Sequence, residues 1–170
     1  MLGIRATRMT ETKRSLLWLG DYGWCDHARL FVSRTNTASD IIREYVDSDA
    51  FGTSFIDPNL GGHQELYHGP FHRASIVATD FELVSPQTFD DLIDEIHYDF
   101  EEPVTDEQWQ EIRKLVSEIR ARHTWFFSLR LTERDKDCFH EFGDILWFFR
   151  EFICASPDFD FAERLVFGYD

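Results

Sequence analysis

One glycine-rich segment, residues 61–72, gathers side chains that are suited to binding a metal ion. Its four possible ligands lie within ten residues of one another: His63, Glu65, His68 and His72. Imidazole and carboxylate groups are good ligands for zinc and similar metals, so a zinc-like ion is one cofactor that this sequence suggests. The spacing differs from the HExxH pattern, and Pro70 prevents a single helix over the whole segment. The same residues therefore also fit a polar loop with scattered histidines and no cofactor.

A second feature is a long acidic interval. The chain has 32 Asp and Glu residues against 17 Lys and Arg residues, which gives a formal net charge of −15. Residues 74–112 contain no Lys or Arg at all. We predict that the acidic residues in the second half of this interval bind a partner: Asp90, Asp91, Asp94, Glu95, Asp99, Glu101, Glu102, Asp106 and Glu107. A surface of this sign attracts basic proteins and repels nucleic acid, although acidic helix faces also serve simply to keep proteins in solution.

A third feature is the tripeptide Cys25-Asp26-His27, which we expect in the turn of a hairpin. A cysteine nucleophile needs a base close in space, and residues at positions i and i+2 of an extended chain share a side. The sequence indicates no further member of such a site. It also lacks the GxSxG, P-loop, dinucleotide-binding and CxxC motifs. The absence of these motifs favours a non-enzymatic protein but leaves catalysis open.

Hydrophobic periodicity predicts the elements that position these side chains. Alternating apolar residues predict strands over residues 15–20, 28–33, 74–84, 124–131 and 161–169. Helical spacing and capping residues predict helices over 39–47, from Pro86 to about residue 100, from residue 105 to about 119, and over 139–153. The order β-β-α-β-α-α-β-α-β is typical of an α+β domain. We therefore predict a mostly antiparallel sheet of about five strands with helices packed on one face.

The length of 170 residues fits one domain. We predict that it covers residues 15–170, after an extension over residues 1–14 that we expect to be flexible, with Met9 as a possible start. The 17 Phe, 5 Tyr and 5 Trp residues argue against disorder. No segment approaches the roughly 20 apolar residues that a membrane span needs. Three cysteines without paired spacing favour a reducing compartment, so we expect a cytoplasmic protein without a membrane partner.

These observations lead to one principal hypothesis and two alternatives. The principal hypothesis is a non-enzymatic acidic protein that binds a basic protein. In size and charge it is like immunity proteins and inhibitors that mimic nucleic acid, which is an analogy of type and not of residues. One alternative is a small metal-binding protein or metal-dependent enzyme that uses the histidine loop. The other is a homo-oligomeric domain whose surplus of aromatic side chains covers an interface.

Overall fold

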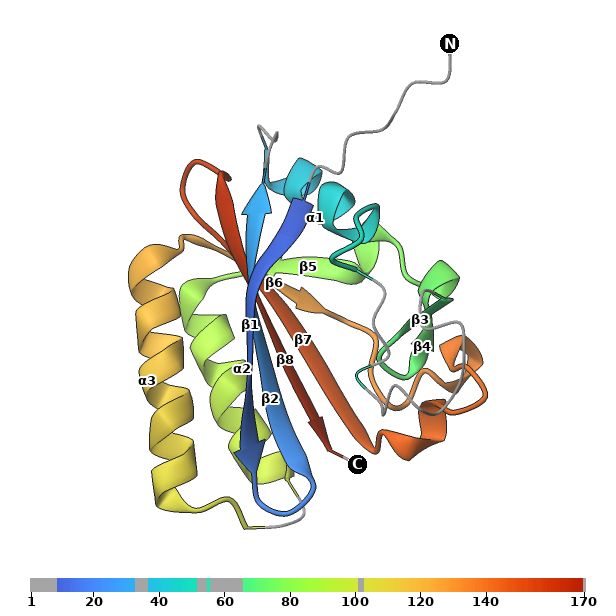
Figure 1. Ribbon diagram of the computed structural model, residues 1–170, viewed down its shortest axis with the longest axis vertical. Coiled ribbons are helices and arrows are strands. Elements are labelled where there is room, and N and C mark those ends of the chain that lie inside the picture. Colours follow the sequence, from blue (N-terminus) through green and yellow to red (C-terminus); the bar gives the residue numbers. More distant parts are fainter. Residues whose placement is uncertain (1–8, 33–36, 52–54, 56–65, 101–102, 170) are drawn as a thin grey trace.

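The computed structural model describes residues 9–32, 37–51, 55, 66–100 and 103–169. Its centre is a six-stranded antiparallel sheet (Figure 1). The strands are β1 (Met9–Leu19), β2 (Gly23–Val32), β5 (Phe81–Val84), β6 (Trp125–Leu129), β7 (Phe148–Ala155) and β8 (Phe161–Tyr169). They lie in the order β1-β2-β8-β7-β6-β5, so the last strand of the chain separates β2 from β7. The predicted α+β domain with an antiparallel sheet is confirmed.

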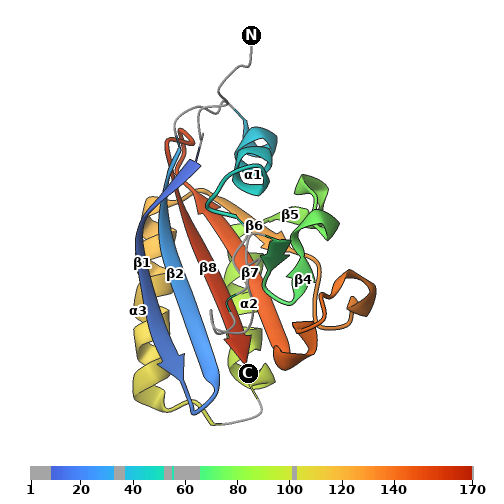
Figure 2. The same cartoon turned by 45° about the vertical axis from the view of Figure 1, so that its right-hand side comes forward.

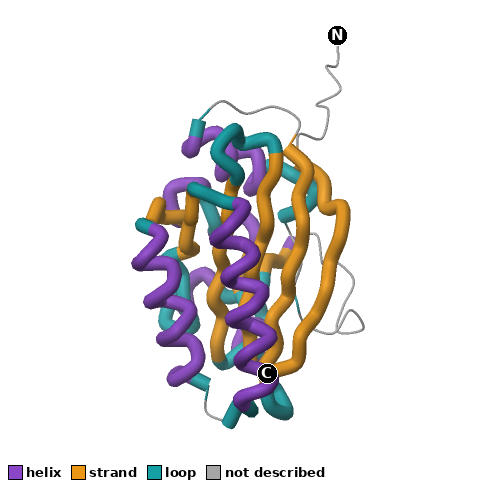
Figure 3. The backbone as a smooth tube through the Cα atoms, turned by 90° about the vertical axis from the view of Figure 1, so that its left-hand side faces the viewer, coloured by secondary structure: helices purple, strands orange, loops and turns teal. Residues whose placement is uncertain are grey.

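We predicted about five strands with helices on one face, but the sheet has six strands and helices pack on both sides, because its central strands bury side chains on both faces. The two long helices, α2 (Pro86–Asp99) and α3 (Asp106–Arg122), lie side by side over one face (Figure 3). The short helix α1 (Ala38–Val46) and the small hairpin of β3 (Tyr67–His68) and β4 (Phe71–His72) lie on the other side (Figure 2). In the described part of the chain, no helix is both long and apolar enough to cross a membrane.

The long helices begin at the residues that the sequence indicated. Ser85 caps α2, because its hydroxyl accepts a hydrogen bond from the Thr88 backbone N–H, and Pro86 follows as the first helical residue. Thr105 and Gln108 form the predicted capping box of α3. The predicted apolar stripe of α3 is buried at all four positions, Trp109, Ile112, Val116 and Ile119. The capping residues thus fix where both helices start, and the stripe fixes which side faces the sheet.

The predicted helix over residues 139–153 is wrong, because most of this region forms β7 and the turns before it. Strand β7 lies in the middle of the sheet and has side chains buried on both faces. Phe149 and Ile153 belong to the core beneath α1, whereas Phe152 and Cys154 belong to the core beneath α2 and α3. A strand covered on both faces has no alternation of apolar and polar residues, and its apolar positions then imitate helical spacing.

Two further boundaries differ from the prediction. Strand β1 begins at Met9, so residues 9–14, which we expected in a flexible extension, are part of the sheet, and residues 1–8 lie outside the described residues. The strand predicted over residues 74–84 is only four residues long, since two short 3-10 turns, Arg73–Ser75 and Ala78–Asp80, occupy the segment before β5. In the second turn, the Asp80 carboxylate accepts a hydrogen bond from the Val77 backbone N–H, which stabilises the turn in place of strand pairing.

Candidate functional site

The acidic surface predicted from the sequence lies on α2 and the start of α3. Six of its residues are exposed, and we call them the acidic helix face: Asp91, Asp94, Glu95, Asp99, Asp106 and Glu107. They point outward because the opposite side of α2, with Phe89, Ile93 and Ile96, is buried against the sheet. Glu101 and Glu102, which we also predicted to bind a partner, lie outside the described residues.

Helix α3 neutralises part of this surface. Arg120 lies against Asp90, with its Nε 3.0 and 3.2 Å from the two carboxylate oxygens. Arg113 lies 3.8 Å from Asp94. These arginines follow the acidic interval in the sequence, and only the antiparallel packing of α3 beside α2 brings them to it. Asp90 therefore belongs to an ion pair between the two helices, and the acidic helix face is narrower than the sequence interval.

One large aromatic side chain lies within the acidic helix face. Tyr98 on α2 is 84% exposed, between Glu95 and Asp99 in the sequence. The two other aromatic residues near this segment, Phe100 and Trp109, are buried in the core beneath the helices. Tyr98 thus combines a large apolar surface with a hydroxyl group among carboxylates, which is the composition of an anchor in a protein interface.

The histidine loop is described only at its end. His68 and His72 belong to the β3–β4 hairpin, but His68 is opposite Phe71 and His72 is opposite Tyr67, so the two imidazoles do not share a position across the ladder. His68 is fully buried, whereas His72 is exposed. His63 and Glu65 lie outside the described residues. Among the residues that are described, no group of three possible ligands is placed to hold a metal ion. The zinc hypothesis stays a prediction.

The function of His68 within the described structure is to bind a buried carboxylate. Its Nε2 lies 2.5 Å from Oε2 of Glu151 on β7, and its ring stacks on Phe51 with ring centroids 3.8 Å apart. The hydroxyl of Tyr45 donates to the other oxygen of Glu151, at 2.5 Å. Burial and the charge of Glu151 raise the pKa of Tyr45, so the phenol keeps the proton that it donates. These contacts join α1, the hairpin and β7 on one face of the sheet.

On the same face of the sheet, Arg164 of β8 is fully buried among oxygen atoms. It donates to the backbone oxygen of Ala50 at 2.7 Å and to the carboxylates of Glu11 at 3.1 Å and Asp26 at 3.4 Å. Arg14 donates to the other oxygen of Asp26, at 2.6 Å. A pocket of about 400 Å³ lies above this group, with Arg164, Arg14 and Glu11 among its lining residues. Asp49 also lines the pocket, so its two arginines are balanced by two carboxylates and the lining has no surplus of either sign.

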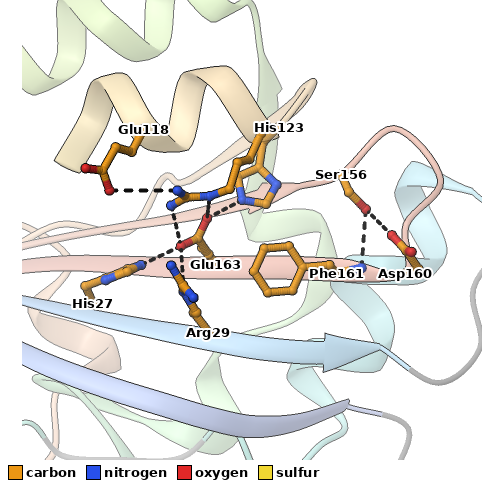
Figure 4. A network of polar contacts seen from close by, with 9 residues as sticks. His27, Arg29, Glu118, His123, Ser156, Asp160, Phe161 and Glu163 are labelled. Carbon is orange, nitrogen blue, oxygen red and sulfur yellow. Dashed lines mark hydrogen bonds and ion pairs between the residues drawn. The ribbon is translucent and has the colours of Figure 1, made fainter. Parts of the chain in front are cut away.

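A second buried network, on the face of the sheet beneath α3, is centred on Glu163 of β8 (Figure 4). His27 Nε2 lies 2.8 Å from one carboxylate oxygen, and His123 donates from its Nε2 to the other. Arg122, the last residue of α3, donates to both oxygens at 2.9 and 3.1 Å. Arg29, opposite Glu163 in the ladder, approaches to 3.5 Å. One carboxylate thus fixes the end of α3 to β2 and β8.

The electrostatics of this network favour a charged Glu163. Burial raises its pKa, but hydrogen bonds from His123, His27 and Arg122 outweigh burial and hold the pKa well below the usual range of a carboxyl group. Glu163 itself is fully buried, while Arg29 and Arg122 are partly exposed at the rim. The group is closed around its own carboxylate, so we interpret it as a structural ion network and not as a catalytic acid or base.

The tripeptide Cys25-Asp26-His27 lies within β2 and not in the hairpin turn where we predicted it. As expected for extended chain, Asp26 contributes to the Arg164 group on one face, while Cys25 and His27 lie on the other face. Cys25 is fully buried, and burial followed by the charge of Asp26 raises the pKa of its thiol. A buried thiol with a raised pKa is a poor nucleophile, so Cys25 belongs to the apolar core, while Asp26 and His27 each join one of the polar networks.

The sequence contained a signal for both networks that periodicity alone does not reveal. The neighbours Glu163 and Arg164 lie in an apolar strand, as Arg150 and Glu151 do in β7. Charged residues inside a buried strand need partners, because an unpaired buried charge is costly.

A comparison of the chain with protein-family models, curated proteins and solved structures finds no match in any of the three. The function is therefore inferred from the residues of the site and their chemistry.

Proposed function

We propose that this chain is a non-enzymatic domain that binds a basic protein through the acidic helix face. The observation that supports this proposal is the outer side of α2, which presents carboxylates around an exposed Tyr98 and carries no Lys or Arg of its own. Carboxylates attract a cationic surface over about 10 Å at moderate ionic strength. An exposed aromatic ring supplies the contact that gives a protein interface most of its binding energy.

The position of the charge supports a specific surface rather than a general solubilising charge. Arg113 and Arg120 neutralise the side of α2 that faces α3, at Asp94 and Asp90, while Asp91 and Glu95 remain exposed without a cation beside them on the helix. Like charges held close together on a helix repel each other and lower its stability. A cationic partner would relieve that repulsion on binding. The repulsion that lowers the stability of the isolated domain would therefore add to the free energy of association.

The kind of partner follows from the same charges. A protein that binds nucleic acid presents clustered Lys and Arg side chains, which are complementary to a row of carboxylates. Nucleic acid itself would be repelled by this surface. We therefore expect the partner to be a protein with a basic surface of that type, which this chain would cover or inhibit.

The experiment is affinity capture from the native cell extract with the immobilised chain, followed by identification of the bound proteins. It compares the wild type with Asp91→Lys/Glu95→Lys on the acidic helix face. The control is Asp137→Lys/Asp158→Lys, which reverses two exposed carboxylates elsewhere and so changes the net charge by the same amount. We expect a basic protein that the wild type and the control retain at about 0.05 M salt, and that the α2 variant and about 0.5 M salt release.

Tyr98 provides the second part of this experiment. Tyr98→Ala should weaken binding of the captured protein by about tenfold or more, as is usual for an aromatic anchor. The side chain is 84% exposed, so its removal should leave the melting temperature unchanged. The proposal fails if the α2 variant retains the same proteins as the wild type, or if the control loses them equally.

A further inference from the structure

The two edges of the sheet differ in length and in protection. Strand β5 forms one edge with four residues, whereas β1 forms the other with eleven. Within β1, every residue from Thr10 to Leu16 is exposed, and so is Trp18. An edge strand presents backbone N–H and C=O groups that another strand can pair with, and proteins usually protect such an edge by shortness, charge or a bulge. The shortness of β5 protects that edge of the sheet. The question is then what protects the longer edge formed by β1.

Only the first half of β1 has such protection. Its pairing with β2 shifts register between Glu11 and Lys13, which marks an irregularity in the strand, and Arg14 adds a further charge. The second half, Ser15–Leu19, has regular register with β2 and contains no charged residue and no proline. It therefore presents a backbone edge of five residues with which no other described strand pairs.

Two apolar side chains accompany this open edge. Leu16 is 48% exposed and Trp18 is 59% exposed. They lie on the same face of the sheet, because Leu16 is opposite Asp26 and Trp18 is opposite Trp24 in the β1–β2 ladder. That face is the one away from α2 and α3. The open edge and the exposed apolar pair thus coincide in one segment, which is the composition of a strand-pairing surface.

We propose that Ser15–Leu19 pairs with the same segment of a second copy of this chain, antiparallel and about a twofold axis at Leu17. In a sheet that continues across a twofold axis perpendicular to it, directly opposed residues point to the same face, so the axis must pass through a residue position. With the axis at Leu17, Leu16 of one copy is opposite Trp18 of the other. Each copy thus covers the exposed apolar pair of its neighbour.

The charges flanking this segment fit the same register. Counting outward from Leu17, Lys13 of one copy is opposite Asp21 of the other, in the turn that follows β1. Both side chains are exposed, and neither forms an ion pair within the residues that the structure describes. The twofold axis forms this Lys–Asp pair twice. An axis shifted by one residue to Leu16 would instead place Lys13 opposite Leu19, so charge complementarity selects Leu17.

The interface is short, so we expect a reversible dimer. Five paired residues from each copy form a contact at the small end of specific interfaces, so we expect weak association with a dissociation constant on the order of 10–100 µM. The resulting sheet would run through both copies with β1 of each at its centre. The larger part of the acidic helix face lies on α2, whereas its α3 end is close to the end of β1, where the Gly20 backbone N–H donates to Gln108.

Sedimentation velocity of the full chain between about 1 and 300 µM tests the dimer. We expect a shift from monomer to dimer over this range for the wild type and only monomer for Trp18→Lys. The matched control is Leu83→Lys, which introduces the same charge at a leucine that is 50% exposed on the opposite edge strand and should leave the dimer intact. Melting temperatures of both variants should stay near the wild type, since each replaced side chain is half exposed.

A charge exchange tests the register separately. Lys13→Glu and Asp21→Lys should each weaken the dimer by about threefold to tenfold, and the double variant should restore it, because the pair is re-formed with opposite signs. A wild type that remains a monomer at about 300 µM overturns the proposal. So does a dimer that Trp18→Lys leaves unchanged, one that Leu83→Lys abolishes, or a double variant no stronger than its single variants.

Discussion

The substitution Glu163→Gln removes the charge at the centre of the network beneath α3 with almost no change in size. Glu163 is fully buried, and four side chains direct N–H groups or cations at its two oxygens. In the glutamine variant, one oxygen becomes an NH2 group that faces donors, and the two arginines lose their common counter-charge. We expect the variant to fold, with a large loss of stability and no loss of secondary structure.

The magnitude follows from burial. Breaking a buried ion pair by neutralising one partner costs about 3–5 kcal/mol, and we expect about 3 kcal/mol here because the remaining amide oxygen still accepts a hydrogen bond. Urea unfolding measures this loss as a midpoint lower by about 1–3 M. The control is Asp90→Asn, which removes another carboxylate with two contacts to one arginine, but whose side chain is 36% exposed. A pair of that exposure contributes less than about 1 kcal/mol.

The pH dependence supplies a second measurement with a definite sign. The pKa of Glu163 in the folded protein is lower than the value of about 4.3 expected for the unfolded chain. The unfolded state therefore binds more protons below about pH 5, and the stability that this group contributes is complete above that pH and declines as the pH falls. Glutamine does not titrate, so the difference between wild type and variant should narrow between pH 7 and about pH 3.

Two results would refute this reasoning. If Glu163→Gln lowers the urea midpoint no more than Asp90→Asn does, the network is not the buried ion cluster that its geometry indicates. If the difference in unfolding free energy between wild type and Glu163→Gln stays constant from pH 7 to about pH 3, the carboxyl group is not held charged by its neighbours. If the variant is already unfolded at pH 7, the loss of unfolding free energy is larger than the range of about 3–5 kcal/mol expected for a broken buried ion pair.

Two further predictions concern other buried groups. Arg164→Met, which keeps most of the side-chain volume, should lower the unfolding free energy by about 3 kcal/mol in urea titration, because Glu11 and Asp26 lose a buried cation; an unchanged midpoint would show that the pair contributes nothing. Cys25 and Cys154 are buried, whereas Cys138 is partly exposed, although burial and nearby carboxylates also raise the pKa of its thiol. Because access differs, we expect a thiol reagent to modify one cysteine in the native protein and three in denaturant.

The parts of the fold that the sequence predicts well are those with one buried and one exposed side. The four buried positions of α3 and its capping box follow from local chemistry within the helix. Such elements meet solvent on one face, so the pattern of apolar residues reports the direction of burial. The same reason explains why Ser85 and Pro86 locate the start of α2.

The parts that fail depend on contacts between distant residues. β7 is covered on both faces, so its sequence has no alternation, and Arg150 and Glu151 look like interruptions of an apolar helix. Glu151 in fact meets His68 and Tyr45, which are separated from it by 83 and 106 positions. The acidic interval is visible in the sequence, but its partial neutralisation by Arg113 and Arg120 depends on how α3 packs beside α2. The periodicity of apolar residues indicates which positions are buried. It does not indicate which distant residues a buried polar side chain contacts.

The position of β8 between β2 and β7 has a consequence for how the chain folds. Among the described strands, β8 is the last to be synthesised, yet it alone joins the β1–β2 hairpin to the β7–β6–β5 strands. The contacts between β2 and β8 join residues at least 130 positions apart in the sequence, so the closure of this loop is entropically costly and slow. Until β8 has been synthesised, β2 and β7 each have one edge without its partner strand. We therefore expect the insertion of this strand to limit the formation of native structure, and a nascent chain without it to be prone to aggregation.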